Sequence, residues 1–376
     1  MKTVLVVGYN TRHICASAKK AGFNVFSIEH FGDRDLFEIA DEVVVFEDSQ
    51  ADNDTRESDI GESMKRFDYD ALVCGPGFEQ SDFGTELSVL NNDKKLVEKV
   101  SDKFWLSEYL REIGVKHPST FLLEDVVPST LKYPVMVKPR SGAGGVKNLL
   151  VLNSEQLEEI KWSFNDFIVQ EYIEGVTASV SLIAACGEAC SIGTSEEISG
   201  FPWLTNIPYA YSGSITPSNY KHVEVMKELA ENVVCDLMLV GSNGVDFLLS
   251  DKGLFLLEIN PRFQGTLETV EHAYKLNVFS MHVAAFSGEL PQPVSAKCFA
   301  GRAILFAKND VWIDQRMSDL LFDCYKKETA SDVPWHNTLI LKDKPIVTFF
   351  AAGTTRAETL TKLRNITNET SNGDLF

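Results

Sequence analysis

The segment that most constrains the fold of this chain is residues 244–262, GVDFLLSDKGLFLLEINPR. Two apolar runs flank residues 251–253 (Asp-Lys-Gly), a pattern that predicts a hairpin with a three-residue loop and its glycine at the left-handed position. In that register Asp246 lies directly opposite Glu258, and strand alternation puts Asn260 on the same face as Glu258. One face of one hairpin therefore gathers two carboxylates and an amide.

This arrangement favours a cation site. Like charges directly opposite each other destabilise a sheet, and a bound divalent cation removes that repulsion. Oxygen ligands with open coordination positions suit Mg²⁺ shared with substrate phosphates, with Mn²⁺ as an alternative. The apolar neighbours favour burial over the other interpretation, a surface hairpin with scattered acids. We therefore predict Asp246, Glu258 and Asn260 as metal ligands, with Arg262 just beyond them.

A second segment, residues 133–151, reads YPVMVKPRSGAGGVKNLLV. Lys138 is an isolated cation in an apolar strand, and the small residues 141–145 follow it. Such a loop lets backbone N–H groups close around phosphate oxygens, while the lysine supplies a point charge. It is not a Walker A motif, because GxxxxGK[ST] is missing and the chain returns to a strand. By itself the segment is equally compatible with a glycine-rich hairpin turn.

The third segment is FIVQEYIEG, residues 167–175, an apolar strand that ends in polar residues and a glycine. Together with SDK at 101–103, the three segments resemble the ATP-grasp superfamily, in the order and spacing of its carbamoyl-phosphate-synthase and biotin-carboxylase branch. The resemblance covers residues 90–290 and extends to archaeal and bacterial carboxylate–amine ligases.

The resemblance implies roles for individual residues. Lys103 and Lys138 are similar to the two phosphate-contacting lysines, and Ser141, Gly142, Gly144 and Gly145 to the loop that covers the triphosphate. It further implies that Gln170 faces the adenine amino group and that Glu171 and Ile173 offer backbone groups to the adenine edge. Asp246, Glu258 and Asn260 correspond to the Mg²⁺ ligands, and Arg262, with Lys138, to the catalytic cations. Thr177 stands where several relatives have a ribose-binding acid.

The expected fold class is α/β and α+β in three parts. Residues 3–8, 12–21 and 24–28 predict a βαβ opening, hence a Rossmann-like α/β domain over residues 1–100, although GxGxxG is absent. An ATP-grasp domain of two α+β subdomains is expected over 101–292, with a small lid at about 115–172. A β-rich α+β segment, 293–376, is expected to complete the substrate site, with a hairpin at LILKDKPIVTFF (residues 339–350).

Composition excludes some partners. With 35 Lys+Arg against 54 Asp+Glu the net charge is −19, so nucleic acid and anionic membranes are not expected partners. Such a chain must concentrate its cations, and the motifs gather Lys103, Lys138, Arg140, Lys147 and Arg262 at one phosphate site. The acidic segment 47–70 is interpreted as a solvated loop and helix. The sequence has no apolar run of about 20 residues and no signal-peptide pattern, and its seven cysteines are scattered. These features predict a cytoplasmic protein with reduced thiols.

The predicted function is an ATP- and Mg²⁺-dependent ligase that forms C–N bonds through an acyl phosphate. Its expected partners are small, amino-acid-like carboxylate and amine substrates, with a homodimer as one assembly. Glu79 and Arg302 are weaker candidates for substrate contacts, since a loop carboxylate and a structural ion pair explain them equally well. Two other functions stay open: a biotin-carboxylase-like or carbamoyl-phosphate-forming enzyme, and an inactive nucleotide-binding regulator.

Overall fold

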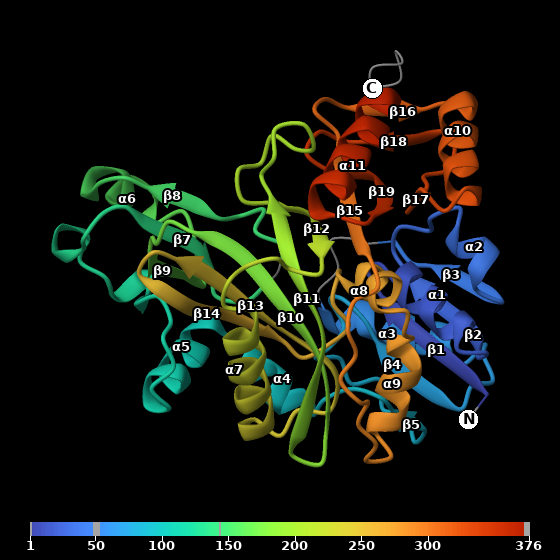
Figure 1. Cartoon of the computed structure of the whole chain (residues 1–376), viewed down its shortest axis with the longest axis horizontal. Coiled ribbons are helices and arrows are strands. Elements are labelled where there is room, and N and C mark those ends of the chain that lie inside the picture. Colours follow the sequence, from blue (N-terminus) through green and yellow to red (C-terminus); the bar gives the residue numbers. More distant parts are fainter. Residues whose placement is uncertain (1, 48–52, 143, 372–376) are drawn as a thin grey trace.

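The computed structural model describes residues 2–47, 53–142 and 144–371. In these residues helices surround three larger sheets, of five, four and eight strands, and a two-stranded one (Figure 1). The mixed α/β and α+β fold class predicted from the sequence is confirmed. Ala143 of the glycine-rich loop and residues 48–52 of the acidic segment lie outside the described residues.

The five-stranded sheet is the N-terminal layer, and all its pairs are parallel. In the order β3-β2-β1-β4-β5, its strands are Glu42–Val45, Asn24–Glu29, Thr3–Gly8, Ala71–Cys74 and Ser88–Val89. The helices that accompany it are α1 (Arg12–Lys20), α2 (Leu36–Ile39) and α3 (Asn53–Met64). Val4 to Val7 are fully buried, as expected for a central parallel strand covered on both faces.

The four-stranded antiparallel sheet forms a separate layer at the left of Figure 1. Its strands, in the order β6-β9-β7-β8, are Thr120–Leu122, Phe167–Glu171, Val135–Pro139 and Leu149–Val151. Helix α6 (Ser154–Lys161) packs on it through Leu157, which is fully buried. Helices α4 (Lys94–Ser101) and α5 (Lys103–Glu112) lead into this layer, and Asp102 separates them as the N-cap of α5. We keep the name lid for residues 115–172, as a proposal.

The eight-stranded sheet forms the centre of the molecule, in the order β14-β13-β10-β11-β12-β15-β19-β17. Its first five strands are β10 (Val176–Ala185), β11 (Glu188–Ser199), β12 (Tyr211–Thr216), β13 (Gly241–Ser250) and β14 (Gly253–Asn260). Helix α7 (Val223–Asp236) packs on one face, while α8 (Leu267–Tyr274) and α9 (Val278–Ala285) share a core cluster with α1. The last two helices thus join this sheet to the N-terminal layer.

The remaining strands come from the C-terminal segment. They are β15 (Phe299–Phe306), β16 (Val311–Ile313), β17 (Ala330–Ser331), β18 (Thr338–Ile340) and β19 (Pro345–Gly353), with helices α10 (Gln315–Lys326) and α11 (Arg356–Ser371). The predicted 339–350 hairpin is wrong, because β18 pairs with β16 while β19 pairs with β15 and β17. Two strands separated by a turn-like KDK sequence enter different sheets here, which local turn chemistry does not reveal. No helix among the described residues is long and apolar enough to span a bilayer.

The hairpin of β13 and β14 keeps the predicted facing pair but not the predicted loop. Asp246 pairs with Glu258 as expected, whereas Ser250 pairs with Gly253, so the loop has two residues instead of three. A β-bulge between Asp246 and Phe247 restores the register by accommodating Leu257 as the extra residue. The bulge lies next to the two carboxylates and therefore sets the direction of Glu258.

Candidate active site

A cavity of about 1100 Å³ lies where the lid, the central sheet and the N-terminal layer meet. Among the residues that line it are all but one of the predicted site residues: Lys103, Lys138, Ser141, Gly142, Gly144, Gly145, Gln170, Glu171, Ile173, Asp246, Glu258, Asn260, Arg262 and Arg302. The exception is Glu79. The fold thus brings together residues that lie as much as 199 positions apart, from Lys103 to Arg302.

The predicted metal ligands form a connected set on β13 and β14. Asn260 Nδ2 donates a hydrogen bond to Asp246 Oδ2 at 2.8 Å, which leaves the amide oxygen of Asn260 facing Arg262. Burial and the negative charges of Glu197 and Glu258 raise the pKa of Asp246 well above its ordinary value. Although burial favours protonated Glu258, the charges of Lys103 and Lys138 hold its pKa below the ordinary value.

These side chains fit Mg²⁺. The raised pKa of Asp246 means that its ionised form lacks a sufficient positive neighbour, which a divalent cation would supply. Within the described ranges no group of three or more His, Cys, Asp or Glu side chains could hold a metal by itself. Two carboxylates and an amide leave coordination positions for phosphate oxygens, as Mg²⁺ at a nucleotide requires.

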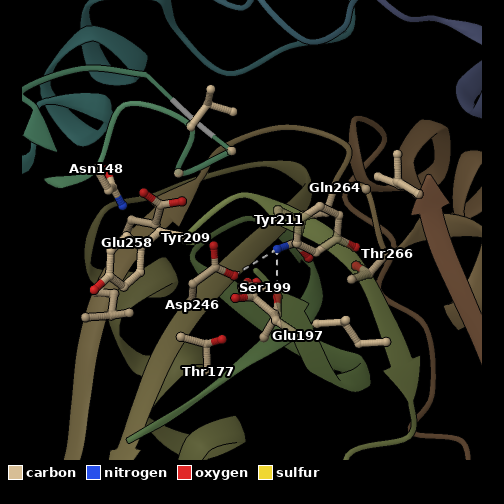
Figure 2. A pocket seen from close by; sticks show the side chains of 18 of the residues that line it. Asn148, Thr177, Glu197, Ser199, Tyr209, Tyr211, Asp246, Glu258, Gln264 and Thr266 are labelled. Carbon is tan, nitrogen blue, oxygen red and sulfur yellow. Dashed lines mark hydrogen bonds between the residues drawn. The ribbon is translucent and has the colours of Figure 1, made fainter. Parts of the chain in front are cut away.

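Glu197 on β11 is a third carboxylate at this place, and the sequence interpretation missed it. In Figure 2 its side chain lies near Asp246, with Thr177 beside it. Burial and the charge of Glu258 raise the pKa of Glu197 to about 7, while a hydrogen bond with Thr177 opposes that shift. The available signal was the pair Glu196-Glu197 in a strand, because alternation must turn one of two adjacent acids toward the cavity. Thr177 thus contacts an acid on the neighbouring strand.

Two lysines converge on the carboxylates from the lid side. Lys103 is the first residue of α5, whose N-cap Asp102 accepts from the N–H groups of Phe104 and Trp105. Its Nζ lies 3.6 Å from Glu258 Oε2 and donates to the carbonyl oxygen of Gly142 at 2.7 Å. Arg140 does not line the cavity, contrary to expectation, and binds both oxygens of Asp102 instead. Arg140 therefore binds the residue that caps the helix beginning at Lys103.

Lys138 gives nucleotide binding a predicted pH dependence. Burial, reinforced by the charge of Lys103, lowers the pKa of Lys138 to about 8. Phosphate favours the ammonium form, so the affinity for Mg·ADP should be greatest below that pH and fall up to about tenfold per unit above it. Calorimetry at about pH 7 and pH 9, in buffers of different ionisation enthalpy, should show proton uptake at the higher pH. Lys138→Met should lose the uptake, and an unchanged uptake in that variant would contradict the assignment.

The glycine-rich loop touches the segment before β12. The N–H of Tyr211 donates to the carbonyl oxygen of Gly144 at 3.0 Å. Gly145 has φ +68, and a Cβ there would lie 2.1 Å from the carbonyl oxygen of Tyr209. Tyr209 and Asn148 appear close together at the rim in Figure 2. The close backbone approach explains why a glycine is required at position 145.

Replacing Gly145 should therefore displace the loop. In Gly145→Ala the added methyl group meets backbone, and the positive φ adds about 1 kcal/mol of strain. We expect the KM for ATP to rise about tenfold or more, because the loop amides lose their position over the phosphates. Gly144→Ala is the matched control, since its φ is similarly positive, +79, and nothing lies within 4 Å of an added Cβ. Equal KM values for the two variants would show that the Tyr209 contact is unimportant.

The end of the cavity predicted to hold adenine combines polar groups with an apolar surface. Gln170 is buried and donates through Nε2 to Thr120 Oγ1 at 2.9 Å, which leaves its Oε1 as an acceptor. No described residue accepts from the N–H of Ile173, whose side chain packs with Leu248, Phe255 and Leu257. An acceptor and a donor beside an apolar surface suit a purine ring. The Glu171 side chain is exposed, so its backbone is the part available.

Arg262 extends from the end of β14 into the cavity. Its Nε lies 2.6 Å from Glu79 Oε1, and its terminal nitrogens donate to the Asn260 side chain and the Phe263 carbonyl oxygen. Glu79 also accepts from the N–H of Gly77 at 2.8 Å, so a turn of the N-terminal layer fixes it. Glu79 therefore contacts Arg262 but does not itself line the cavity.

Gln264 was also missed from the sequence. Its Nε2 donates to Ser179 Oγ at 2.8 Å and lies 3.4 Å from Asp246 Oδ1, and Figure 2 draws the bond to Asp246. Gln264 follows INPR by two residues, in a stretch whose pattern does not show which side chains turn inward. Arg302 on β15 is buried nearby, and it donates to the carbonyl oxygen of Gly265. A polar path therefore leads from Asp246 to Arg302.

Comparison with known proteins agrees with this architecture. Residues 100–266 match the family model of the ATP-grasp domain. An uncharacterized protein of Methanocaldococcus jannaschii is 26% identical over 368 residues, 92% of this chain and 87% of that protein. Biotin carboxylase from Campylobacter jejuni has a TM-score of 0.76 at 15% identity, over 100% of this chain and 96% of that one. L-amino acid ligase from Bacillus licheniformis has a TM-score of 0.72 at 15% identity, over 98% of both chains.

The domain match identifies an ATP-grasp domain, and the homologues of that family are ATP-dependent ligases that form C–N bonds. Residues 100–266 form an ATP-grasp domain, so the family resemblance seen in the sequence is confirmed. The roles of the individual side chains rest on the geometry described above and stay proposals.

Proposed function

We propose that this protein is a carboxylate–amine ligase that activates a small, amino-acid-like carboxylate with ATP and joins it to an amine. A carboxylate oxygen of the substrate attacks the γ-phosphorus of ATP, the bond to the β-phosphate oxygen breaks, and ADP leaves. The amine nitrogen then attacks the carbonyl carbon of the acyl phosphate. Inorganic phosphate departs, the amine loses a proton, and an amide remains.

The observation that carries the proposal is one cavity. It contains both the side chains proposed to bind phosphate and the side chains proposed to contact the substrate. Lys103, Lys138 and Arg262 surround the Asp246–Glu258 pair, and the same cavity continues to Arg302. Mg²⁺ held by Asp246, Glu258 and Asn260 would bridge phosphate oxygens and offset their charge. The lysines position the phosphates, and Arg262 faces the place where negative charge develops on the transferred phosphoryl group. An L-amino acid ligase among the structures of the same fold agrees with this chemistry.

The test is release of ADP from Mg·ATP across a panel of carboxylic acids, with hydroxylamine present to trap an acyl phosphate as a hydroxamate. We expect a hydroxamate with an amino-acid-like carboxylate. Bicarbonate belongs in the panel, because ADP release with bicarbonate alone would indicate a carboxylating or carbamoyl-phosphate-forming enzyme. Binding of ATP without turnover on any acid would contradict the ligase proposal and favour a regulatory protein.

A further inference from the structure

The end of the cavity remote from the adenine edge lies between the N-terminal layer and the C-terminal strands. It is lined by Asn10, Arg12, His13 and Asp33 from the N-terminal layer, and by Arg302 and Asp332 from the C-terminal segment. Arg302 lies 4.0 Å from Asp332 through one terminal nitrogen. Because Arg302 also contacts Gly265, next to Gln264, this end is continuous with the carboxylates of β13 and β14.

Most charges at this end have partners within the protein. Arg12 binds Glu268 through both terminal nitrogens and Asp332 through Nε, at 2.8 Å for the latter. Asp35 accepts from the backbone N–H groups of Asp332 and Val333, which ties α2 to the C-terminal segment. Glu29 accepts from Thr11 and from the N–H of Gly32. These acids maintain the structure.

Asp33 is different. It lines the cavity, and no described residue gives its carboxylate a hydrogen bond or an ion pair. Burial and the charges of Asp332, Glu29 and Asp35 raise its pKa well above the ordinary value. The Arg12 guanidinium opposes this shift only in part, because Glu268 and Asp332 already bind it, so an ionised Asp33 carboxylate is unfavourable unless a further positive group occupies the cavity beside it.

His13 provides an independent observation. Asn10 Nδ2 lies 3.4 Å from Asp332 Oδ1, so the amide oxygen of Asn10 faces His13 Nδ1, 3.2 Å away. His13 therefore carries its proton on Nδ1, and Nε2 presents a lone pair. Burial and the charge of Arg12 lower the pKa of His13 to about 3, which keeps the ring neutral. Its Nε2 is buried without a hydrogen-bond partner in a side chain that is 7% exposed and lines the cavity.

We propose that Asp33 and His13 Nε2 bind the charged amino group of a substrate, at a subsite for an ammonium that does not take part in the reaction. Both groups are acceptors, and an ammonium offers three donors and a positive charge. Carboxylate neighbours keep that nitrogen protonated, so it cannot attack an acyl phosphate. The inference rests on the proposed ligase function and narrows its substrate to acids that also carry a free amino group, such as α-amino acids.

The test measures binding, without turnover. The twenty common L-amino acids are screened by thermal shift on the full chain with Mg·ADP, and the strongest binder is compared by calorimetry with its desamino acid, which has the same carbon skeleton. We expect the amino acid to bind about tenfold or more tightly, as charge-assisted hydrogen bonds imply. Asp33→Asn and His13→Gln should each remove the difference in affinity between the amino acid and its desamino acid. Asp323→Asn, at an exposed position on α10, is the matched control.

A purely structural role for Asp33 predicts the opposite effect on stability. Since the raised pKa means that ionised Asp33 costs folding free energy at neutral pH, Asp33→Asn should raise the Tm of the ligand-free protein while it weakens the binding of the amino acid. The subsite is refuted if no amino acid binds more tightly than its desamino acid, or if Asp33→Asn keeps the difference. A protein that shows the preference but forms no hydroxamate would refute the ligase proposal alone.

Discussion

Glu258→Gln should reduce ATP-dependent hydroxamate formation about 10²- to 10³-fold or more, one of the two largest effects expected from a single change in this protein. Glutamine keeps the shape of the side chain but removes one of the two charges proposed to hold Mg²⁺, and it leaves Lys103 without its carboxylate partner at 3.6 Å. Steady-state rates at saturating and limiting Mg²⁺ measure the effect, and added Mg²⁺ should recover only part of it.

The loss should not come from unfolding. The Glu258 side chain is 28% exposed, and an ion pair of that kind contributes about 0–1 kcal/mol, so Tm should change by only a few degrees. Glu228→Gln, at an exposed position on α7, is the matched control and should behave as the wild type. Turnover near the wild-type value in Glu258→Gln would refute the metal assignment.

Arg262→Gln should lower kcat about 10²- to 10³-fold while the affinity for Mg·ADP changes little. The guanidinium faces the β13–β14 carboxylates from the end of the hairpin, where negative charge develops during phosphoryl transfer, whereas ADP lacks the transferred group. Single-turnover formation of ADP, measured beside calorimetric binding of Mg·ADP, separates the two quantities.

Glu79→Gln tests how Arg262 is held. Glu79 contacts Arg262 at 2.6 Å but does not line the cavity, so its loss should lower kcat about tenfold and leave the affinity for Mg·ADP unchanged. A raised KM for the carboxylic acid in Glu79→Gln would mean that Glu79 touches substrate directly, as the sequence interpretation allowed. A large loss of ADP affinity in Arg262→Gln would instead assign that arginine to ground-state binding.

The sequence predicts this site best where local rules decide the geometry. Asp246 faces Glu258 because strand alternation and a short hairpin leave few registers. The predicted hairpin loop was nevertheless one residue too long. Asp246 still pairs with Glu258 because a bulge at Leu257 offsets the shorter loop by one residue. Bulges have no clear sequence signal.

Features that depend on distant strands could not be predicted. Glu197 approaches Asp246 because β11 and β13 both pair with β10, and Gln264 reaches Asp246 through a turn with no regular pattern. Asp33 and His13 become part of the cavity only when the C-terminal segment brings Arg302 and Asp332 beside them. Motifs identify the proposed nucleotide end of the cavity, whereas tertiary packing creates the proposed substrate end.

The continuity of the eight-stranded sheet has a consequence for anyone who wishes to shorten this protein. The domain match ends at residue 266, yet β12 pairs on its far side with β15, which begins at Phe299. A fragment cut at the end of the match would present β12 as a bare edge with unpaired N–H and C=O groups, ready to pair with another copy. A shortened version of this protein should therefore extend through β19, because β15 covers the edge of β12 and β19 covers the edge of β15.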